Sequence, residues 1–164
     1  MITLVTGGAR SGKSRYALDE VDESGPFTYI ATAELLDGEM RERAARHRTE
    51  RGSRWQTIEE PYEVGARLVE LKGVVVVDCL TMWLSNWMSR DETQLEKEIE
   101  SLCSAFLTAP CHIRAITNEV GSSIVPDNAL ARRFRDWAGI MNQRVAAAAD
   151  EVYLMVCGIA LKIK

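Results

Sequence analysis

Short apolar runs rich in β-branched residues alternate along this chain with longer segments whose apolar residues recur every three or four positions. The short runs occupy 2–6, 27–32, 55–59, 74–78, 113–117, 151–156 and 159–164. Such runs predict strands, and the last two, joined around Gly158, predict a hairpin at the edge of a sheet. Strands that alternate with helices predict an α/β fold with a mostly parallel sheet.

The longer segments predict helices between these strands. Segment 14–23 lacks Gly and Pro, segment 37–51 is strongly charged, and segment 62–71 has its apolar residues on one side. Three apolar stripes follow at helical spacing: Leu80, Trp83, Leu84, Trp87 and Met88; Leu95, Ile99, Leu102 and Phe106; and Leu130, Phe134, Trp137, Met141, Val145 and Ala148. The last stripe predicts a core-facing helix that begins at 126–128. Trp83 and Trp87 predict core packing or a subunit contact, with an apolar ligand surface as the alternative.

The composition limits the size and the partners of the protein. With 164 residues, 46% of them hydrophobic, residues 1–164 are expected to form a single domain. The 20 basic and 24 acidic side chains give a formal net charge of −4, which predicts neither a nucleic-acid partner nor an anionic membrane. No apolar run reaches the length of about 18 residues that a membrane span needs, and the N-terminus does not resemble a secretory signal. A cytoplasmic protein is therefore expected.

The cysteines and histidines limit the kinds of site that the chain can form. The four cysteines have no C-x-x-C spacing, which favours free thiols over disulfides. The chain has only two histidines, His47 and His112, so a histidine-rich metal site is excluded.

The segment 7–14 carries the chain's most specific motif. It fits G-x-x-x-x-G-K-[ST], follows the first predicted strand and opens the first predicted helix. Its residues are Gly7, Gly8, Ala9, Arg10, Ser11, Gly12, Lys13 and Ser14. In such a loop the backbone N–H groups close around phosphate oxygens, Lys13 reaches the β- and γ-phosphates, and the Ser14 hydroxyl binds Mg²⁺. A chance glycine-rich turn is the alternative, and the strand–loop–helix context favours the phosphate-binding interpretation.

Carboxylate and amide groups follow two of the later strands. Asp78 ends the run of valines at 74–77, as a Walker-B acid that shares the Mg²⁺ site with Ser14 would. Asn118 and Gly121 follow the strand at 113–117. They could orient an attacking group or sense a γ-phosphate, and turn or capping chemistry explains them equally well.

The segment 37–51 is the most basic region of this acidic protein. It carries five arginines and one histidine: Arg41, Arg43, Arg46, His47, Arg48 and Arg51. A solvated helix face with pairs such as Glu39–Arg43 is one interpretation, and a second set of contacts to a triphosphate is the other. The residues by themselves therefore predict a single-domain P-loop NTPase that uses Mg²⁺, without naming a second substrate.

Several motifs together resemble the bifunctional adenosylcobinamide kinase/adenosylcobinamide-phosphate guanylyltransferase family of cobalamin biosynthesis. The resemblance covers essentially the whole chain. It rests on the segments 5–15, 29–33, 39–40 with His47, 117–121 with 124–126, 142–144 and 158–164. The P-loop occurs in many families, but its combination with the Thr-Asn-Glu-Val-Gly segment at 117–121 and the C-terminal strands is much more specific.

The resemblance implies a RecA-like fold, a homotrimer and two reactions. In the first, GTP or ATP would phosphorylate the hydroxyl of the aminopropanol arm of adenosylcobinamide. In the second, GTP would transfer GMP to the resulting phosphate, which yields adenosylcobinamide-GDP and pyrophosphate. Retention of only the guanylyl transfer is a narrower alternative. A GTP-dependent switch or binding module and a generic small-molecule kinase are the rivals from other classes.

The resemblance also assigns roles to individual residues. It makes His47 the guanylylated nucleophile, with Arg46, Arg48 and Arg51 as groups that offset phosphate charge. It places Ala31, Thr32 and Ala33 along the nucleotide site, Glu59 near the guanine and Asp78 at the Walker-B position. His112 matches none of the motifs and is expected to be structural or exposed.

Overall fold

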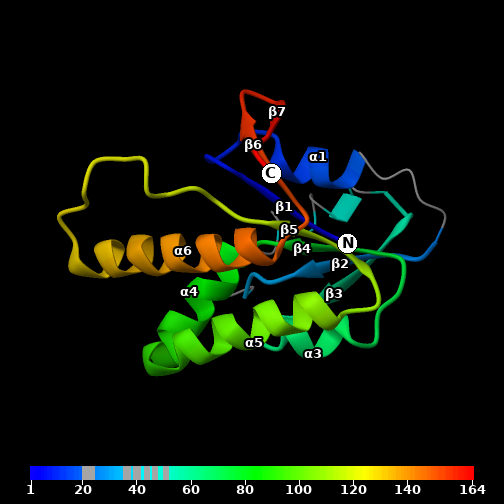
Figure 1. Cartoon of the computed structure of the whole chain (residues 1–164), viewed down its shortest axis with the longest axis horizontal. Coiled ribbons are helices and arrows are strands. Elements are labelled where there is room, and N and C mark those ends of the chain that lie inside the picture. The colour runs from blue at the N-terminus through cyan, green and yellow to red at the C-terminus, as the bar shows by residue number, and fades with distance from the viewer. Residues whose placement is uncertain (20–24, 35–37, 39–41, 43–44, 46–47, 50–51) are drawn as a thin grey trace.

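The computed structural model describes residues 1–19, 25–34, 38, 42, 45, 48–49 and 52–164. In this part of the chain seven strands form one sheet in the order β3-β2-β4-β5-β1-β6-β7 (Figure 1). Neighbouring strands are parallel except for β6 and β7. The strands are β1 (Ile2–Gly7), β2 (Phe27–Ala31), β3 (Trp55–Glu59), β4 (Val74–Asp78), β5 (His112–Ile116), β6 (Glu151–Val156) and β7 (Ile159–Lys162).

Helices cover both faces of this sheet. Figure 1 shows α1 on one side and α3, α4, α5 and α6 on the other. Among the described residues outside segment 35–51, the helices are α1 (Lys13–Asp19), α3 (Val64–Leu68), α4 (Leu80–Asp91), α5 (Leu95–Thr108) and α6 (Ala129–Ala148), with one 3₁₀ turn between α4 and α5. The prediction of an α/β fold with a mostly parallel sheet is confirmed, and so is the antiparallel hairpin at its edge.

The two faces of the sheet bury separate clusters because successive strand residues point to opposite sides. Leu4, Val75 and Val77 belong to the cluster under α3–α6. Val5 and Val76 belong to the cluster on the α1 side. The sequence of a strand that is buried on both faces is a continuous apolar run, which explains the four valines of β4.

Trp83 and Trp87 are buried in the cluster under α3–α6, with ring centroids 6.4 Å apart. Of the three interpretations of this stripe, core packing is therefore the correct one. A subunit contact or a ligand surface formed by these two indoles is wrong, since both side chains are enclosed by residues of their own chain.

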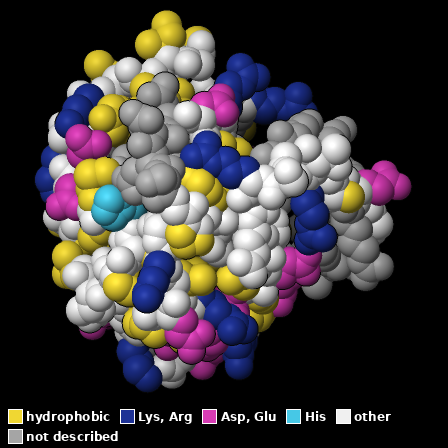
Figure 2. Space-filling model, turned by 90° about the vertical axis from the view of Figure 1, so that its right-hand side faces the viewer, with side chains coloured by type: hydrophobic (Ala, Val, Ile, Leu, Met, Phe, Trp, Pro, Cys, Tyr) yellow, Lys and Arg dark blue, Asp and Glu magenta, His cyan; other side chains and the backbone are white. Residues whose placement is uncertain are grey.

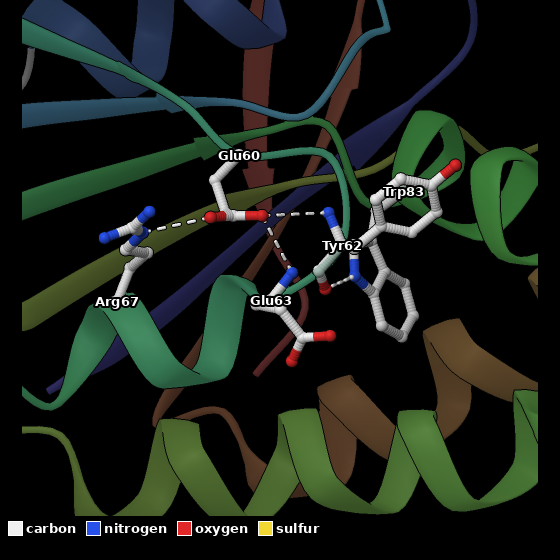
Figure 3. A network of polar contacts seen from close by, with 5 residues as sticks. All are labelled: Glu60, Tyr62, Glu63, Arg67 and Trp83. Atoms are coloured by element: carbon white, nitrogen blue, oxygen red, sulfur yellow. Dashed lines mark hydrogen bonds and ion pairs between the residues drawn. The ribbon is translucent and has the colours of Figure 1, made fainter.

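The predicted helix at 62–71 is shorter in the structure, where α3 spans only Val64–Leu68. Before it, the Glu60 carboxylate accepts hydrogen bonds from the backbone N–H groups of Tyr62 (3.3 Å) and Glu63 (3.0 Å) (Figure 3). These bonds hold a turn at the positions where the sequence pattern predicts the first helical residues. After α3 the N–H of Leu71 bonds to the carbonyl of Leu68, three residues back, so the helix has already ended.

The apolar stripe of α6 is only partly a core face. Ala138, Met141 and Val145 are buried, but Leu130 in the first turn is 56% exposed. The helix begins at Ala129 because the Asn128 side chain accepts a hydrogen bond from the N–H of Ala131 at 3.1 Å. This first turn extends beyond the sheet (Figure 1), so periodicity correctly predicted the helix and wrongly predicted the burial of its first turn.

Charged side chains of both signs are interspersed on the face drawn in Figure 2. This distribution agrees with a formal net charge of only −4. None of the helices that the structure describes combines the length and the apolar character needed to cross a membrane. All four cysteines are free thiols, as their spacing predicts.

The Glu60 carboxylate is the centre of the network in Figure 3, and its side chain is 12% exposed. Burial by itself raises the pKa of Glu60. The N–H of Glu63, the Arg67 guanidinium at 3.0 Å and the N–H of Tyr62 outweigh it and hold the pKa below its ordinary value. The Trp83 indole donates to the carbonyl of Tyr62 at 2.8 Å and joins this turn to α4.

Replacing Glu60 with glutamine is expected to lower the free energy of unfolding at pH 7 by about 1–2 kcal/mol, because charge-assisted hydrogen bonds are lost. A carboxylate whose pKa is depressed by folding stabilises the protein above its unfolded-state pKa, and this contribution is lost as the pH falls through the folded pKa. The difference in the free energy of unfolding between wild type and variant should therefore shrink below about pH 4.5. Urea denaturation at pH 7, 5 and 4 measures it, with the exposed Glu70→Gln as a control that removes the same charge.

Candidate active site

The carboxyl ends of the parallel strands bring the predicted site residues to one edge of the sheet. In the register, Ala31 of β2 lies between Glu59 of β3 and Asp78 of β4. Asp78 in turn pairs with Ile116 of β5, which pairs with Val5 of β1 two residues before Gly7. The P-loop, the end of β4 and the end of β2 therefore meet where ligands bind in open α/β sheets.

The backbone conformation of the P-loop requires glycine at two positions. Gly7 has φ of 147°, and a Cβ there would lie 2.5 Å from the carbonyl oxygen of Met155 on β6. Gly12 has φ of 97°, and a Cβ there would lie 3.2 Å from Cα of Gly158. The N–H of Gly158 donates to the carbonyl of Ser11 at 2.9 Å. The turn between β6 and β7 thus supports the P-loop, a contact that sequence periodicity did not predict.

Replacing Gly7 with alanine is expected to lower the free energy of unfolding by at least about 2 kcal/mol, because the new Cβ adds backbone strain to a clash with β6. Gly8→Ala is the matched control, since within the described part of the chain a Cβ at Gly8 would meet nothing within 4 Å. Its effect on stability should stay within about 0.5 kcal/mol. Urea denaturation of both variants checks this, and equal losses would contradict the steric explanation.

Lys13 opens α1 and is only 7% exposed. Its ammonium donates to the carbonyl oxygens of Gly7 (3.0 Å) and Gly8 (2.6 Å). Burial lowers the pKa of Lys13, and the nearby acidic groups of Cys79 and Asp78 partly oppose this shift. The fold therefore holds a poorly hydrated cation beside the loop, which is where the sequence predicts contact with phosphates.

Ser14 and Asp78, the two predicted Mg²⁺ ligands, are in contact although they are 64 residues apart in the sequence. The Ser14 hydroxyl donates to Oδ2 of Asp78 at 3.1 Å. The Tyr29 hydroxyl, from the middle of β2, donates to the same oxygen. A hydroxyl and a carboxylate are the hard oxygen ligands that Mg²⁺ prefers, so this donor set fits the ion that the P-loop implies.

Thr32 connects the ends of β2 and β4. Its hydroxyl donates to the carbonyl of Cys79 at 2.8 Å and accepts from the N–H of Cys79 at 2.9 Å. Its carbonyl accepts from the Asn86 amide of α4 at 2.7 Å. The Thr32 side chain is fully buried, whereas Ala31 and Ala33 on either side are partly exposed. Burial and the charge of Asp78 raise the pKa of the Cys79 thiol.

Asn118 and Gly121 take part in local polar contacts after β5. The Asn118 side-chain amide donates to the Thr81 hydroxyl at 2.7 Å, and the backbone carbonyl of Asn118 accepts from the Asn142 amide of α6 at 3.2 Å. The N–H of Gly121 donates to the Glu119 carboxylate at 2.6 Å. These contacts favour turn and packing chemistry as the role of the two residues.

Arg48 and Glu59 form a salt bridge of 2.8 Å, with side chains 60% and 52% exposed. In the sheet order β3 is two strands from β4, so Glu59 is roughly 10 Å from Asp78 along the edge of the sheet. An open cavity of about 500 Å³ adjoins the arginine and is lined by Arg48, Thr49, Gly52, Ser53, Trp55 and Thr57. Arg48 and Glu59, which are both predicted to bind the nucleotide, are thus in contact with each other, and both side chains are exposed.

The other predicted residues of this basic region lie outside the described residues. They are Glu39, Arg41, Arg43, Arg46, His47 and Arg51. Among the remaining positions of the predicted helix, residues 38, 42, 45, 48 and 49 are helical. The roles assigned to His47, Arg46 and Arg51 stay predictions.

The glycine-rich loop between β1 and α1, its buried lysine and the Ser14–Asp78 contact define a P-loop nucleotide-binding protein. Two solved structures share this fold. An ATPase from the type III secretion system of pathogenic bacteria matches 93% of this chain and 50% of its own, with TM-score 0.53 and 14% identity. A KaiC-like protein from Pyrococcus horikoshii OT3 matches 93% of this chain and 71% of its own, with the same TM-score and identity. At this identity the likeness concerns the fold alone.

Sequence comparison identifies the family. The model of the cobinamide kinase / cobinamide phosphate guanyltransferase family matches residues 3–163, and the chain belongs to this family. It is 41% identical to the bifunctional adenosylcobalamin biosynthesis protein CobU of Escherichia coli (strain K12), with 100% of both chains covered. It is 41% identical to the bifunctional adenosylcobalamin biosynthesis protein CobP of Pseudomonas aeruginosa, over 100% of this chain and 98% of that one. The resemblance inferred from the motifs is confirmed, and the protein is a bifunctional kinase and guanylyltransferase.

Proposed function

We propose that one site built on the P-loop performs both reactions. In the first, the aminopropanol hydroxyl of adenosylcobinamide attacks the γ-phosphorus of GTP or ATP, the bond to the β,γ-bridging oxygen breaks, and the hydroxyl proton passes to solvent. In the second, GMP passes from GTP to the new phosphate, and pyrophosphate leaves. The observation that carries this proposal is the contact between Ser14 and Asp78 beside Lys13, which supplies one triphosphate-binding edge for both steps.

The P-loop residues would bind and orient the triphosphate. Backbone N–H groups of 7–14 and the N-terminus of α1 attract phosphate oxygens. Lys13 would contact the β- and γ-phosphates, and because it is poorly hydrated its charge acts strongly on them. Ser14 and Asp78 would hold Mg²⁺, which offsets charge on the phosphates when it is bound.

His47 would make the guanylyl transfer a two-step reaction. A neutral imidazole nitrogen attacks the α-phosphorus of GTP, the bond to pyrophosphate breaks, and a GMP–histidine phosphoramidate forms. An oxygen of adenosylcobinamide phosphate then attacks the same phosphorus, and the imidazole leaves. Arg46, Arg48 and Arg51 would offset the charge of the leaving pyrophosphate.

Glu59 would recognise guanine, because a carboxylate can accept hydrogen bonds from N1–H and from the exocyclic amine of this base. Its contact with Arg48 supports the assignment, since the guanidinium holds the carboxylate at the end of β3 while more than half of the Glu59 side chain stays accessible. Ala31, Thr32 and Ala33 would line the path between this carboxylate and Asp78.

The origin of the phosphorus atoms in the product tests the two transfer reactions of this proposal. Purified enzyme is incubated with adenosylcobinamide, Mg²⁺ and GTP labelled at either the α- or the γ-phosphate. Both labels should reach the product, the γ-label first. A γ-label alone would show a kinase, and an α-label that appears only when adenosylcobinamide phosphate is supplied would show a guanylyltransferase alone. A switch or binding module would transfer neither label.

We also propose a cytoplasmic homo-oligomer, with three subunits as the family resemblance implies. Ile159, Leu161 and Ile163 alternate along the edge strand β7 and the residues after it, and all three side chains are exposed. An apolar strip of this kind at a sheet edge is typical of a surface that another chain covers. Sedimentation velocity measures the number of subunits.

A further inference from the structure

Tyr29 contacts the same carboxylate oxygen as the P-loop serine, and nothing in the sequence motifs gives this tyrosine a role. It lies in the middle of β2 and is 5% exposed. Its hydroxyl donates to Oδ2 of Asp78, which also accepts from Ser14 at 3.1 Å. Two donors from different elements, β2 and α1, therefore converge on one oxygen of the proposed metal-binding acid.

The register of the sheet explains how the tyrosine reaches this oxygen. Tyr29 pairs with Val76 on β4, and Asp78 lies two residues further along the same strand. Residues two apart on a strand point to the same face, so Val76 and Asp78 both face α1. Tyr29 is packed with Phe27, Val76 and other residues of the cluster on this face. Close packing fixes the ring, and with it the position of the hydroxyl.

We infer that Tyr29 is a positioning residue that holds the Asp78 carboxylate in the orientation that serves Ser14 and the metal. This inference rests on the proposed Mg²⁺-binding role of Ser14 and Asp78. A carboxylate rotates easily about its terminal torsion, and the single Ser14 proton is the weaker of its two anchors, because Ser14 also has to offer its oxygen to the metal. The Tyr29 hydroxyl comes from a strand that is paired on both sides, with β3 and with β4. Partners that orient a ligand in this way typically change metal affinity by about 10–100-fold.

Tyr29→Phe tests the inference, because it removes only the hydroxyl. Binding of a fluorescent GTP analogue to the full-length protein is measured while Mg²⁺ is titrated, and again in EDTA. The Mg²⁺ concentration that gives half of the change in affinity should rise about 10-fold. Affinity in EDTA and the thermal unfolding midpoint should remain those of the wild type. Asp78 is only partly buried, so water can replace the lost donor and the variant should fold.

Two further variants separate positioning from a general structural effect. Tyr153→Phe removes a hydroxyl that donates to the Glu151 carboxylate at 3.2 Å on β6, and it should leave the Mg²⁺ midpoint unchanged. Asp78→Asn should raise the midpoint by itself, and adding Tyr29→Phe to it should move the midpoint by less than about twofold, because the tyrosine acts through Asp78.

Two results would overturn the inference while the proposed metal site stands. One is a Tyr29→Phe midpoint equal to that of the wild type. The other is an equal loss of affinity with Mg²⁺ and with EDTA, which would mean that the hydroxyl merely supports the fold. Nucleotide binding by the wild type that does not respond to Mg²⁺ would instead overturn the metal role of Ser14 and Asp78, and the positioning role with it.

Discussion

Replacing Lys13 with alanine is expected to lower both phosphoryl transfer and guanylyl transfer by about 10²–10³-fold, the usual cost of removing one group that stabilises developing charge. The ammonium lies at the start of α1 between the P-loop and Asp78, where both reactions would place the triphosphate. The free energy of unfolding should change little, because burial already disfavours the charged amine in the folded protein. Rates with labelled GTP, measured together with urea denaturation, test both expectations.

Lys162→Ala is the matched control for this change. Lys162 lies on β7, is half exposed and pairs with Glu151 at 2.6 Å, so its removal deletes the same side chain away from the proposed site. Both transfer rates should stay at the wild-type level. If Lys13→Ala lost only one of the two activities, the proposal of a single shared site would be wrong.

Replacing His47 with alanine is expected to abolish covalent labelling of the protein by GTP carrying ³²P at the α-phosphate. Without the imidazole no phosphoramidate can form, while the P-loop residues that are proposed to bind the triphosphate are intact. The assay uses Mg²⁺ and no corrinoid, followed by denaturing electrophoresis. The wild-type label should be lost in acid and stable in base, as expected of a phosphorus–nitrogen bond to histidine. Transfer of the γ-phosphate should continue in the variant.

His112→Ala is the control, because His112 is the only other histidine of the chain. It lies exposed at the start of β5, at the opposite end of the strand from the P-loop edge. This variant should label like the wild type. Labelling of His47→Ala at the wild-type level would show that another residue is the nucleophile, and absence of label in the wild type despite GTP binding would favour a kinase or a switch.

The sequence by itself determined the elements whose causes are local. Four consecutive valines followed by Asp78 predict a buried strand, and the structure has this strand at Val74–Asp78. The P-loop was equally clear, because its glycines, lysine and serine are contiguous and their chemistry depends on that spacing. The family followed from several such contiguous motifs, and the comparison with known relatives confirmed it.

Only the tertiary structure decided which distant residues meet. The contact of Tyr29 with Asp78 and the support of Ser11 by Gly158 depend on the strand order β3-β2-β4-β5-β1-β6-β7 and on its register. The same holds for the burial of Trp83 and the exposure of Leu130, because periodicity defines the apolar side of a helix but not how far its neighbours extend along it. The local sequence pattern reflects interactions between residues that are close along the chain. The site is made by side chains that are distant in the sequence and that the sheet brings together.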